Sequence, residues 1–264
     1  MLITRVITAL FLAVGISSAI LFLPDFWFAA FIFLVTGLAC LELYSIVGVE
    51  RFVVRVVFVA GYFLIFFGFF ITGYDFIPFI YLSMALWILS FFVIVYYPSG
   101  SSWLKNGLFA GLVGTVLLAG SAYSVVIIRG ADDGVFWLFW FFVLTTSVDA
   151  GGYFLGRKYG KHPLAIQVSP GKTLEGLAGG LVFSVLTCVL LSYLFIPASK
   201  LGYYMLFPLI FFCVVGDLVE SVLKRIYGKK DSGAMLPGHG GLLDRIDSVI
   251  PVMTAGAVFL LNGN

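Results

Sequence analysis

The chain has 264 residues, of which 62% are hydrophobic and 11% are charged, and its mean hydropathy is +1.13. Soluble domains carry about 25% charged residues, so this composition excludes a soluble enzyme. It predicts an all-α polytopic integral membrane protein. The net charge of +2 is too small to suggest a polyanionic partner, and we expect no nucleic-acid binding.

A membrane-spanning helix needs about 20 apolar residues, and the sequence predicts nine such helices. The first could be a signal peptide, since Arg5 precedes an apolar run, but no small-residue cleavage site follows it, and we expect an uncleaved helix. Residues 1–130 then form an N-terminal region of five spans, and residues 131–264 form a catalytic region of four spans with two long loops. The predicted spans are 4–23, 27–48, 52–72, 77–97, 106–128, 134–155, 174–196, 202–226 and 247–262.

The loop charges predict an orientation. With nine spans, every Lys and Arg except Arg129 and Lys200 falls on the same side as the N-terminus. The positive-inside rule therefore places the N-terminus in the cytoplasm and the C-terminus outside. Several acids lie near the cytoplasmic ends of their spans, which favours a polar cavity open to the cytosol. These acids are Glu42, Asp149, Asp217 and Glu220.

The three cysteines lie in separate apolar spans, and none belongs to a C-x-x-C pair. They are expected to be buried thiols rather than disulfides or zinc ligands. They are Cys40, Cys188 and Cys213.

Two loops are longer than the rest, which in a compact protein favours a functional role. The loop at 156–173 carries only basic charges, and the loop at 227–246 carries both signs. Just before the second loop, one helical face carries Asp217, Glu220, Ser221 and Lys224 at i, i+3, i+4 and i+7. A salt bridge at a helix end explains Glu220 and Lys224. It does not explain the deeper Asp217, which we assign to a cation.

Asp244 and Asp247 are predicted to open the last span. Acids at a helix start can be simple capping residues, but two acids on one face also suit Mg²⁺, which takes one or two carboxylates and leaves other positions to phosphates. Asp217 and Asp244 would share such a site if the loop folds back. Glycines in the 237–241 turn permit this and allow close approach to a phosphate. His239 in that turn could equally be a structural hydrogen-bonding residue.

The stretch Ser169–Thr173 resembles a P-loop superficially. A P-loop needs glycine where Ile166 stands and a strand before it, and no strand is expected, so we reject that interpretation. Thr173 and Glu175 are expected to cap the next helix. Ser169 and Lys172 could contact phosphate. Glycine pairs four residues apart, at 152 and 156 and at 176 and 180, predict close helix packing within or between protomers.

The loop and its flanks resemble a family signature. The pattern is Ser221-x-x-Lys224-Arg225-x₄-Lys230-Asp231-x-Gly233-x-x-Leu236-Pro237-x-His239-Gly240-Gly241-x-x-Asp244-Arg245-x-Asp247, preceded by Asp149-x₃-Tyr153-x₂-Gly156-Arg157 and Ser169-Pro170-x-Lys172-Thr173-x-Glu175-Gly176. It closely resembles the phosphatidate cytidylyltransferases, also called CDP-diacylglycerol synthases. The resemblance covers the C-terminal half. Gly171 departs from it, because the family often has lysine there.

This resemblance implies a reaction of CTP with phosphatidate that gives CDP-diacylglycerol and pyrophosphate. The lipid phosphate is already an anionic nucleophile, so the protein has to supply positioning and charge neutralisation. The implied metal ligands are Asp217, Asp244 and Asp247, which with Lys224 and Arg225 make up the catalytic set. The implied substrate-binding residues are Arg157, Ser169, Lys172, Ser221, Lys230, His239, Gly240 and Gly241.

The implied cofactor is Mg²⁺, with a second, monovalent cation left open, and the implied location is the inner (plasma) membrane with the site facing the cytoplasm. A homodimer is left open.

Two alternative functions remain. A CTP-dependent lipid kinase of the polyprenol or phytol kind would transfer the γ-phosphate to an alcohol. A cytosol-facing ion-coupled transporter would carry acids at the bilayer midplane and inverted repeats, which the sequence does not favour.

Overall fold

The computed structural model describes residues 2–49, 51–72, 76–195, 203–236, 238 and 240–263. Six of its helices are long and apolar enough to cross a membrane, which agrees with the predicted class of helical polytopic membrane protein. They are α2 (Asp25–Ile46), α4 (Ile77–Val95), α5 (Gly107–Gly130), α6 (Gly134–Tyr159), α7 (Leu174–Phe195) and α8 (Leu206–Ile226).

Three further apolar helices coincide with the remaining predicted segments, but their described apolar parts are shorter. They are α1 (Leu2–Phe22), α3 (Phe52–Thr72) and α10 (Val249–Asn262). Two 3₁₀ turns, at Ser99–Lys105 and Tyr203–Met205, precede α5 and α8. Each of the nine predicted apolar segments thus contains a helix that covers most of its described residues.

The start of the last predicted span needs a correction. Asp244 does not open the final long helix, because it lies in a separate short helix, α9 (Leu243–Ile246), and α10 begins only at Val249. Pro251 supplies the reason. It has no N–H to donate to the carbonyl of Asp247, so a continuous helix through this point would lose a hydrogen bond.

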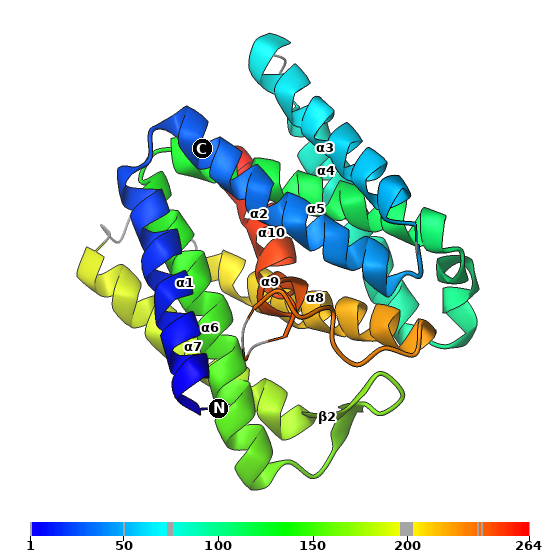
Figure 1. The fold of residues 1–264 in the computed structure, drawn as a ribbon. Coiled ribbons are helices and arrows are strands. Elements are labelled where there is room, and N and C mark those ends of the chain that lie inside the picture. The colour runs from blue at the N-terminus through cyan, green and yellow to red at the C-terminus, as the bar shows by residue number, and fades with distance from the viewer. Residues whose placement is uncertain are drawn as a thin grey trace.

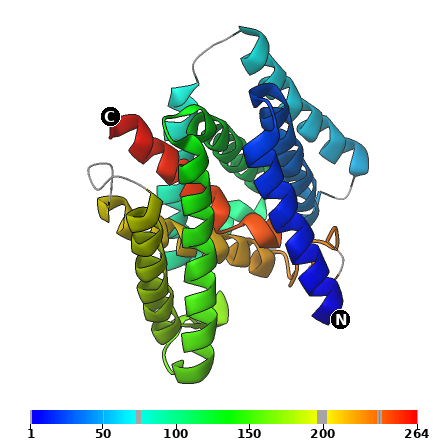
Figure 2. The same ribbon diagram turned by 90° about the vertical axis from the view of Figure 1, so that its left-hand side faces the viewer.

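Helices α6 and α7 lie side by side along their length (Figures 1 and 2), and their glycines explain the close approach. A Cβ atom added at Gly176 would lie 3.0 Å from the carbonyl oxygen of Gly152, and one added at Gly156 would lie 3.3 Å from the Gly176 Cα. The predicted packing role of these small residues is confirmed, within a single chain.

Helix α10 lies in the middle of the molecule, packed against α4, α5, α6 and α8 (Figure 1). Ser121 of α5 fixes its start, because the Ser121 hydroxyl donates to the Ile250 carbonyl at 2.8 Å. The N-terminal end of α1 lies at the same end of the molecule as the loop after α6, and the C-terminus lies at the opposite end (Figures 1 and 2). The three cysteines are free and buried, as predicted.

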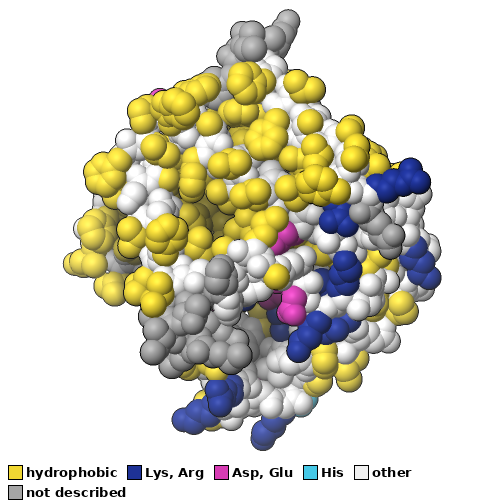
Figure 3. Space-filling model, viewed as in Figure 1, with side chains coloured by type: hydrophobic (Ala, Val, Ile, Leu, Met, Phe, Trp, Pro, Cys, Tyr) yellow, Lys and Arg dark blue, Asp and Glu magenta, His cyan; other side chains and the backbone are white. Residues whose placement is uncertain are grey.

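Large apolar side chains cover much of the surface, as expected for a protein whose solvent is lipid. Phe11, Phe22 and Tyr193 are each more than three-quarters exposed. Figure 3 shows apolar side chains over the upper part of one face, with Lys and Arg gathered at its lower and right-hand edges around a few acids.

The basic loop after α6 contains a small sheet, which corrects the purely helical prediction. Strand β1 (Pro163–Ala165) pairs antiparallel with β2 (Ser169–Thr173). A strand therefore does precede Ser169. The P-loop interpretation is still excluded, since Ile166 occupies the glycine position. The predicted cap at Thr173 is confirmed: its hydroxyl accepts the Gly176 amide at 3.1 Å.

Candidate active site

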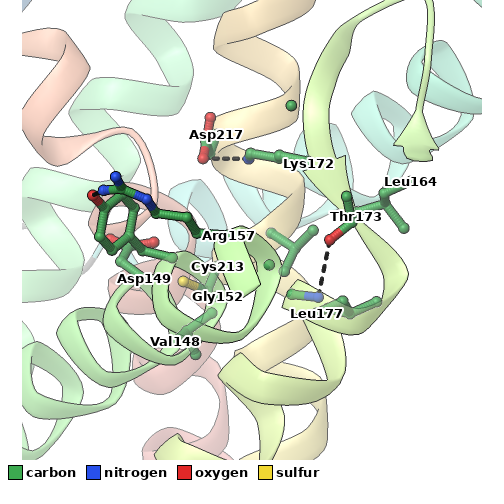
Figure 4. A pocket seen from close by; sticks show the side chains of 15 residues that line it. Val148, Asp149, Gly152, Arg157, Leu164, Lys172, Thr173, Leu177, Cys213 and Asp217 are labelled. Atoms are coloured by element: carbon green, nitrogen blue, oxygen red, sulfur yellow. Dashed lines mark hydrogen bonds and ion pairs between the residues drawn. The ribbon is translucent and has the colours of Figure 1, made fainter. Parts of the chain in front are cut away.

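A cavity of about 650 Å³ opens among α6, the start of α7, α8 and strand β2. Its polar wall is formed by Asp149, Arg157, Lys172 and Asp217 (Figure 4). Glycines of α6 and α7 also line the cavity and leave room in it, because none of them projects a side chain into the space. The cavity therefore combines both signs of charge with an apolar lining, which suits a ligand with a charged head and a greasy body.

Lys172 and Asp217 form an ion pair across the cavity (Figure 4). Lys172 lies on β2 and Asp217 on α8, so the pair holds the hairpin against the helix. Their side chains are 27% and 30% exposed, so both groups remain accessible from the cavity. A polyanionic ligand could draw the lysine away from the aspartate.

Arg157 lies at the end of α6, on the same wall. Its Nη1 donates to the hydroxyl of Tyr153 at 2.6 Å, and its guanidinium lies 5.8 Å from the centre of the Tyr153 ring. Both side chains are exposed. Tyr153 therefore restrains the arginine at the mouth of the cavity, with donors left for an anion.

A second cluster lies where α9 meets the C-terminal end of α8. The Lys224 ammonium donates to Asp244 Oδ1 at 2.7 Å and to Glu220 Oε2 at 3.0 Å. The other oxygen of Asp244 accepts the amides of Ser232 at 3.0 Å and Gly241 at 3.2 Å. This loop thus folds back onto α8, as the sequence predicted.

The charge state of Asp244 follows from these partners. Burial alone would raise the pKa of this carboxyl. The hydrogen bonds from Lys224 and the Ser232 amide outweigh burial and hold the pKa at about 2. Asp244 is therefore a permanent anion at neutral pH.

Asp247 follows α9 and connects the two clusters. Its Oδ1 accepts the Ser248 amide at 2.7 Å, and it lies within electrostatic reach of Glu220, Asp217 and Asp149. A Cβ atom added at Gly216 of α8 would lie 2.2 Å from the Asp247 carbonyl oxygen. The absence of a side chain at 216 therefore allows Asp247 to approach the helix that carries Asp217.

The other predicted residues occupy varied positions. Arg225 Nε donates to the Val168 carbonyl at 3.1 Å, which ties α8 to the turn between the strands. Ser169 is half-buried in β2, Ser221 is half-buried on α8, and Lys230 is exposed. Gly240 has a φ of +87°, which favours glycine. His239 lies outside the described residues.

The sequence predicted Asp149 at a polar cavity and included Tyr153 in the motif at the end of α6, but it assigned neither residue a catalytic or binding role. Gly171, the departure from the family pattern, faces open space. A Cβ atom added there meets no atom within 4 Å, so this position has room for a longer side chain.

The fit of a divalent cation can be tested on these groups. No set of three His, Cys, Asp or Glu side chains within the described ranges is already arranged as a metal site. Both oxygens of Asp244 are taken by hydrogen bonds, and Asp217 pairs with Lys172. Asp149, Asp217 and Asp247 nevertheless lie within electrostatic reach of one another, with Lys172 and Arg245 as the nearby cations. Since Mg²⁺ needs only one or two carboxylates beside substrate phosphates, these acids fit it better than Asp244 does.

The fold and site define a class: a helical membrane protein with a cavity of mixed charge at the ends of its helices. The family model of the Cytidylyltransferase family matches residues 3–262, and the chain belongs to that family.

Relatives with assigned names support this membership. The chain is 37% identical over 184 residues to a phosphatidate cytidylyltransferase of Haemophilus influenzae, covering 63% of this chain and 62% of the relative. It is 47% identical over 130 residues to one of Bacillus subtilis, covering 48% of each. The chain thus spans about half to three-fifths of the length of these relatives.

Proposed function

We propose that the protein transfers the cytidylyl group of CTP to phosphatidate, giving CDP-diacylglycerol and pyrophosphate. The observation that carries this proposal is the cavity at the ends of α6, α7 and α8. It brings Lys172 and Arg157 together with Asp149 and Asp217 in one cavity that also has an apolar lining. Membership of the Cytidylyltransferase family and the names of the relatives support the same reaction.

The chemistry needs few protein groups. A phosphate oxygen of the lipid attacks the α-phosphorus of CTP, the bond to the β-phosphate oxygen breaks, and pyrophosphate leaves with the electron pair. The nucleophile is already anionic, since the second pKa of a phosphate monoester is about 6. No general base is required, and the protein contributes orientation and positive charge.

The cavity cations suit this task. Lys172 can exchange Asp217 for the triphosphate, because both groups are partly exposed. Arg157, restrained by Tyr153, can hold a second phosphate at the cavity mouth. Lys224 is already bound by two carboxylates. Its role is therefore to hold Asp244 and Glu220 in place rather than to bind substrate directly.

The cofactor we propose is Mg²⁺, held by Asp217 and Asp247 with Asp149 nearby. When bound, it would neutralise charge on the triphosphate and the leaving pyrophosphate. Asp244, predicted from the sequence as a third ligand, instead organises the loop through its two amide hydrogen bonds.

We further propose that nine helices cross the membrane, that the protein resides in the inner (plasma) membrane, and that the site faces the cytoplasm. Supporting this, α1 begins at the same end of the molecule as the β hairpin, and basic side chains gather around the acids (Figures 1 and 3). A cytosol-facing cavity would receive CTP from water and the lipid from the bilayer.

The test is pyrophosphate release by purified protein given CTP, phosphatidate and Mg²⁺. We expect lipid-dependent pyrophosphate and a CDP-lipid, both lost in Asp217→Asn. Release of CDP with a phosphorylated lipid alcohol would instead identify a CTP-dependent lipid kinase. Wild-type levels of product from Asp217→Asn at saturating Mg²⁺ would refute the role given to this residue.

A further inference from the structure

A carboxylate from the N-terminal half of the chain contacts the loop at the site. Glu42 lies on α2 and is only 3% exposed. Its Oε2 accepts the Leu243 amide at 2.9 Å and the Ser232 hydroxyl at 3.3 Å. These partners lie 201 and 190 residues further along the chain. Glu42 therefore joins the first half of the protein to the segment that carries Asp244 and Asp247.

The hydrogen bonds continue from Glu42 to Asp244. The Ser232 hydroxyl, which donates to Glu42, accepts the Asp244 amide at 3.3 Å. The Ser232 amide in turn donates to Asp244 Oδ2. One serine thus connects the buried glutamate to both the backbone and the side chain of Asp244, which contacts Lys224.

The loop is shaped to admit this glutamate. A Cβ atom added at Gly233 would lie 2.5 Å from Glu42 Oε1, and one added at Gly241 would lie 2.7 Å from Oε2 and 1.8 Å from Ser232 Oγ. Only glycine fits at either position. The Lys229 ammonium also donates to the Ser45 carbonyl, so α2 holds the loop at a second point.

We propose that Glu42 is a positioning residue for the reaction, acting through residues 228–247 rather than on substrate. By accepting the Leu243 amide and the Ser232 hydroxyl, it fixes α9 and thereby the directions of Asp244 and Asp247. This inference rests on the proposed function and assigns α2 a part in the site. Misplacing a catalytic group by about 1 Å can cost about 100-fold in rate.

The test compares Glu42→Leu, which keeps the bulk but removes both acceptors, with Glu42→Gln. In glutamine, a carbonyl oxygen in the place of Oε2 can still accept both the Leu243 amide and the Ser232 hydroxyl. We expect Glu42→Leu to lower kcat by about 100-fold with little change in KM for phosphatidate, because the cavity lining is untouched. Glu42→Gln should restore most of kcat.

A matched control lies on the same helix. Thr36→Val removes a buried hydrogen bond to Tyr62, remote from the loop, and should lower thermal stability while leaving kcat intact. Trypsin cleavage after the exposed Lys230 gives a readout that does not depend on the reaction. We expect faster cleavage in Glu42→Leu than in wild type or Thr36→Val.

Wild-type kcat in Glu42→Leu, or a loss of kcat equal to that of Thr36→Val, would overturn the inference. If the wild-type protein makes no CDP-lipid, the proposed function fails, and cleavage after Lys230 decides separately whether Glu42 anchors the loop. Equal cleavage rates in Glu42→Leu and wild type would then overturn the anchoring itself.

Discussion

The Lys224 ammonium lies 2.7 Å from Asp244 Oδ1, joining the last turn of α8 to α9 across twenty residues of sequence. Lys224 is 14% exposed and also binds Glu220, which is almost fully buried. The lysine therefore compensates the charge of Asp244 and supplies a hydrogen bond to the buried Glu220. Lys224 thus links the C-terminal end of α8 electrostatically to the segment that carries Asp244.

Removing this lysine should be costly. Lys224→Met leaves Asp244 and Glu220 without their shared cation, and breaking a buried ion pair typically costs about 3–5 kcal/mol. We expect a large fall in thermal stability in detergent together with loss of turnover. Lys105→Met removes an exposed lysine and serves as the control, with a stability change within about 0.5 kcal/mol. Equal melting temperatures for the two variants would contradict the assignment.

The Lys172–Asp217 pair should behave differently, because it is partly exposed. Lys172→Met should change stability by no more than about 1 kcal/mol, yet raise KM for CTP by about tenfold or more if this lysine binds triphosphate. Steady-state kinetics with varied CTP measures this. Lys161→Met, on the same basic loop but outside the cavity, should leave KM unchanged. An unaltered KM in Lys172→Met would remove the lysine from the nucleotide site.

The sequence predicted those features that depend on residues close together in the chain. Apolar runs located the helices, and the glycine spacing gave the contact between α6 and α7. The glycines at 237–241 indicated that the loop can fold back, and in the structure this brings Asp244 to Lys224 rather than to Asp217. The break between α9 and α10 was missed, although Pro251 was visible in the sequence.

Long-range contacts could not be predicted in this way. No periodicity connects Glu42 with Ser232 or Leu243, because that pairing depends on how α2 packs beside the loop. The β hairpin was also missed, since Ser169–Thr173 contains proline and glycine and only one β-branched residue. The contact of Arg225, a residue of the catalytic set that the resemblance implies, was not predicted either: its Nε donates to a backbone carbonyl that the folded hairpin supplies.

The low pKa of Asp244 predicts how a substitution depends on pH. Hydrogen bonds hold this pKa at about 2, below the ordinary value of about 3.9. Its ionised form therefore stabilises the fold above about pH 4, and that contribution is lost as the pH falls towards 2. The defect of Asp244→Asn should be constant between about pH 5 and 9. Activity ratios of variant to wild type across this range test it. A ratio that approaches one below pH 6 would show that Asp244 titrates there.

Gly241 offers the sharpest steric test of the loop. A methyl group there would lie 1.8 Å from Ser232 Oγ and 2.7 Å from the Gly233 nitrogen. Ser232 cannot move away without breaking its hydrogen bonds to Glu42 and Asp244. Overpacking of this kind costs about 1–3 kcal/mol, so Gly241→Ala should lose most activity and be cleaved faster by trypsin after Lys230. Gly61→Ala on α3, where a methyl group meets no atom within 4 Å, is the matched control and should behave as wild type. If both variants keep full activity, the loop must adopt another conformation during turnover, and the contacts between Ser232 and Asp244 would not be those that support catalysis.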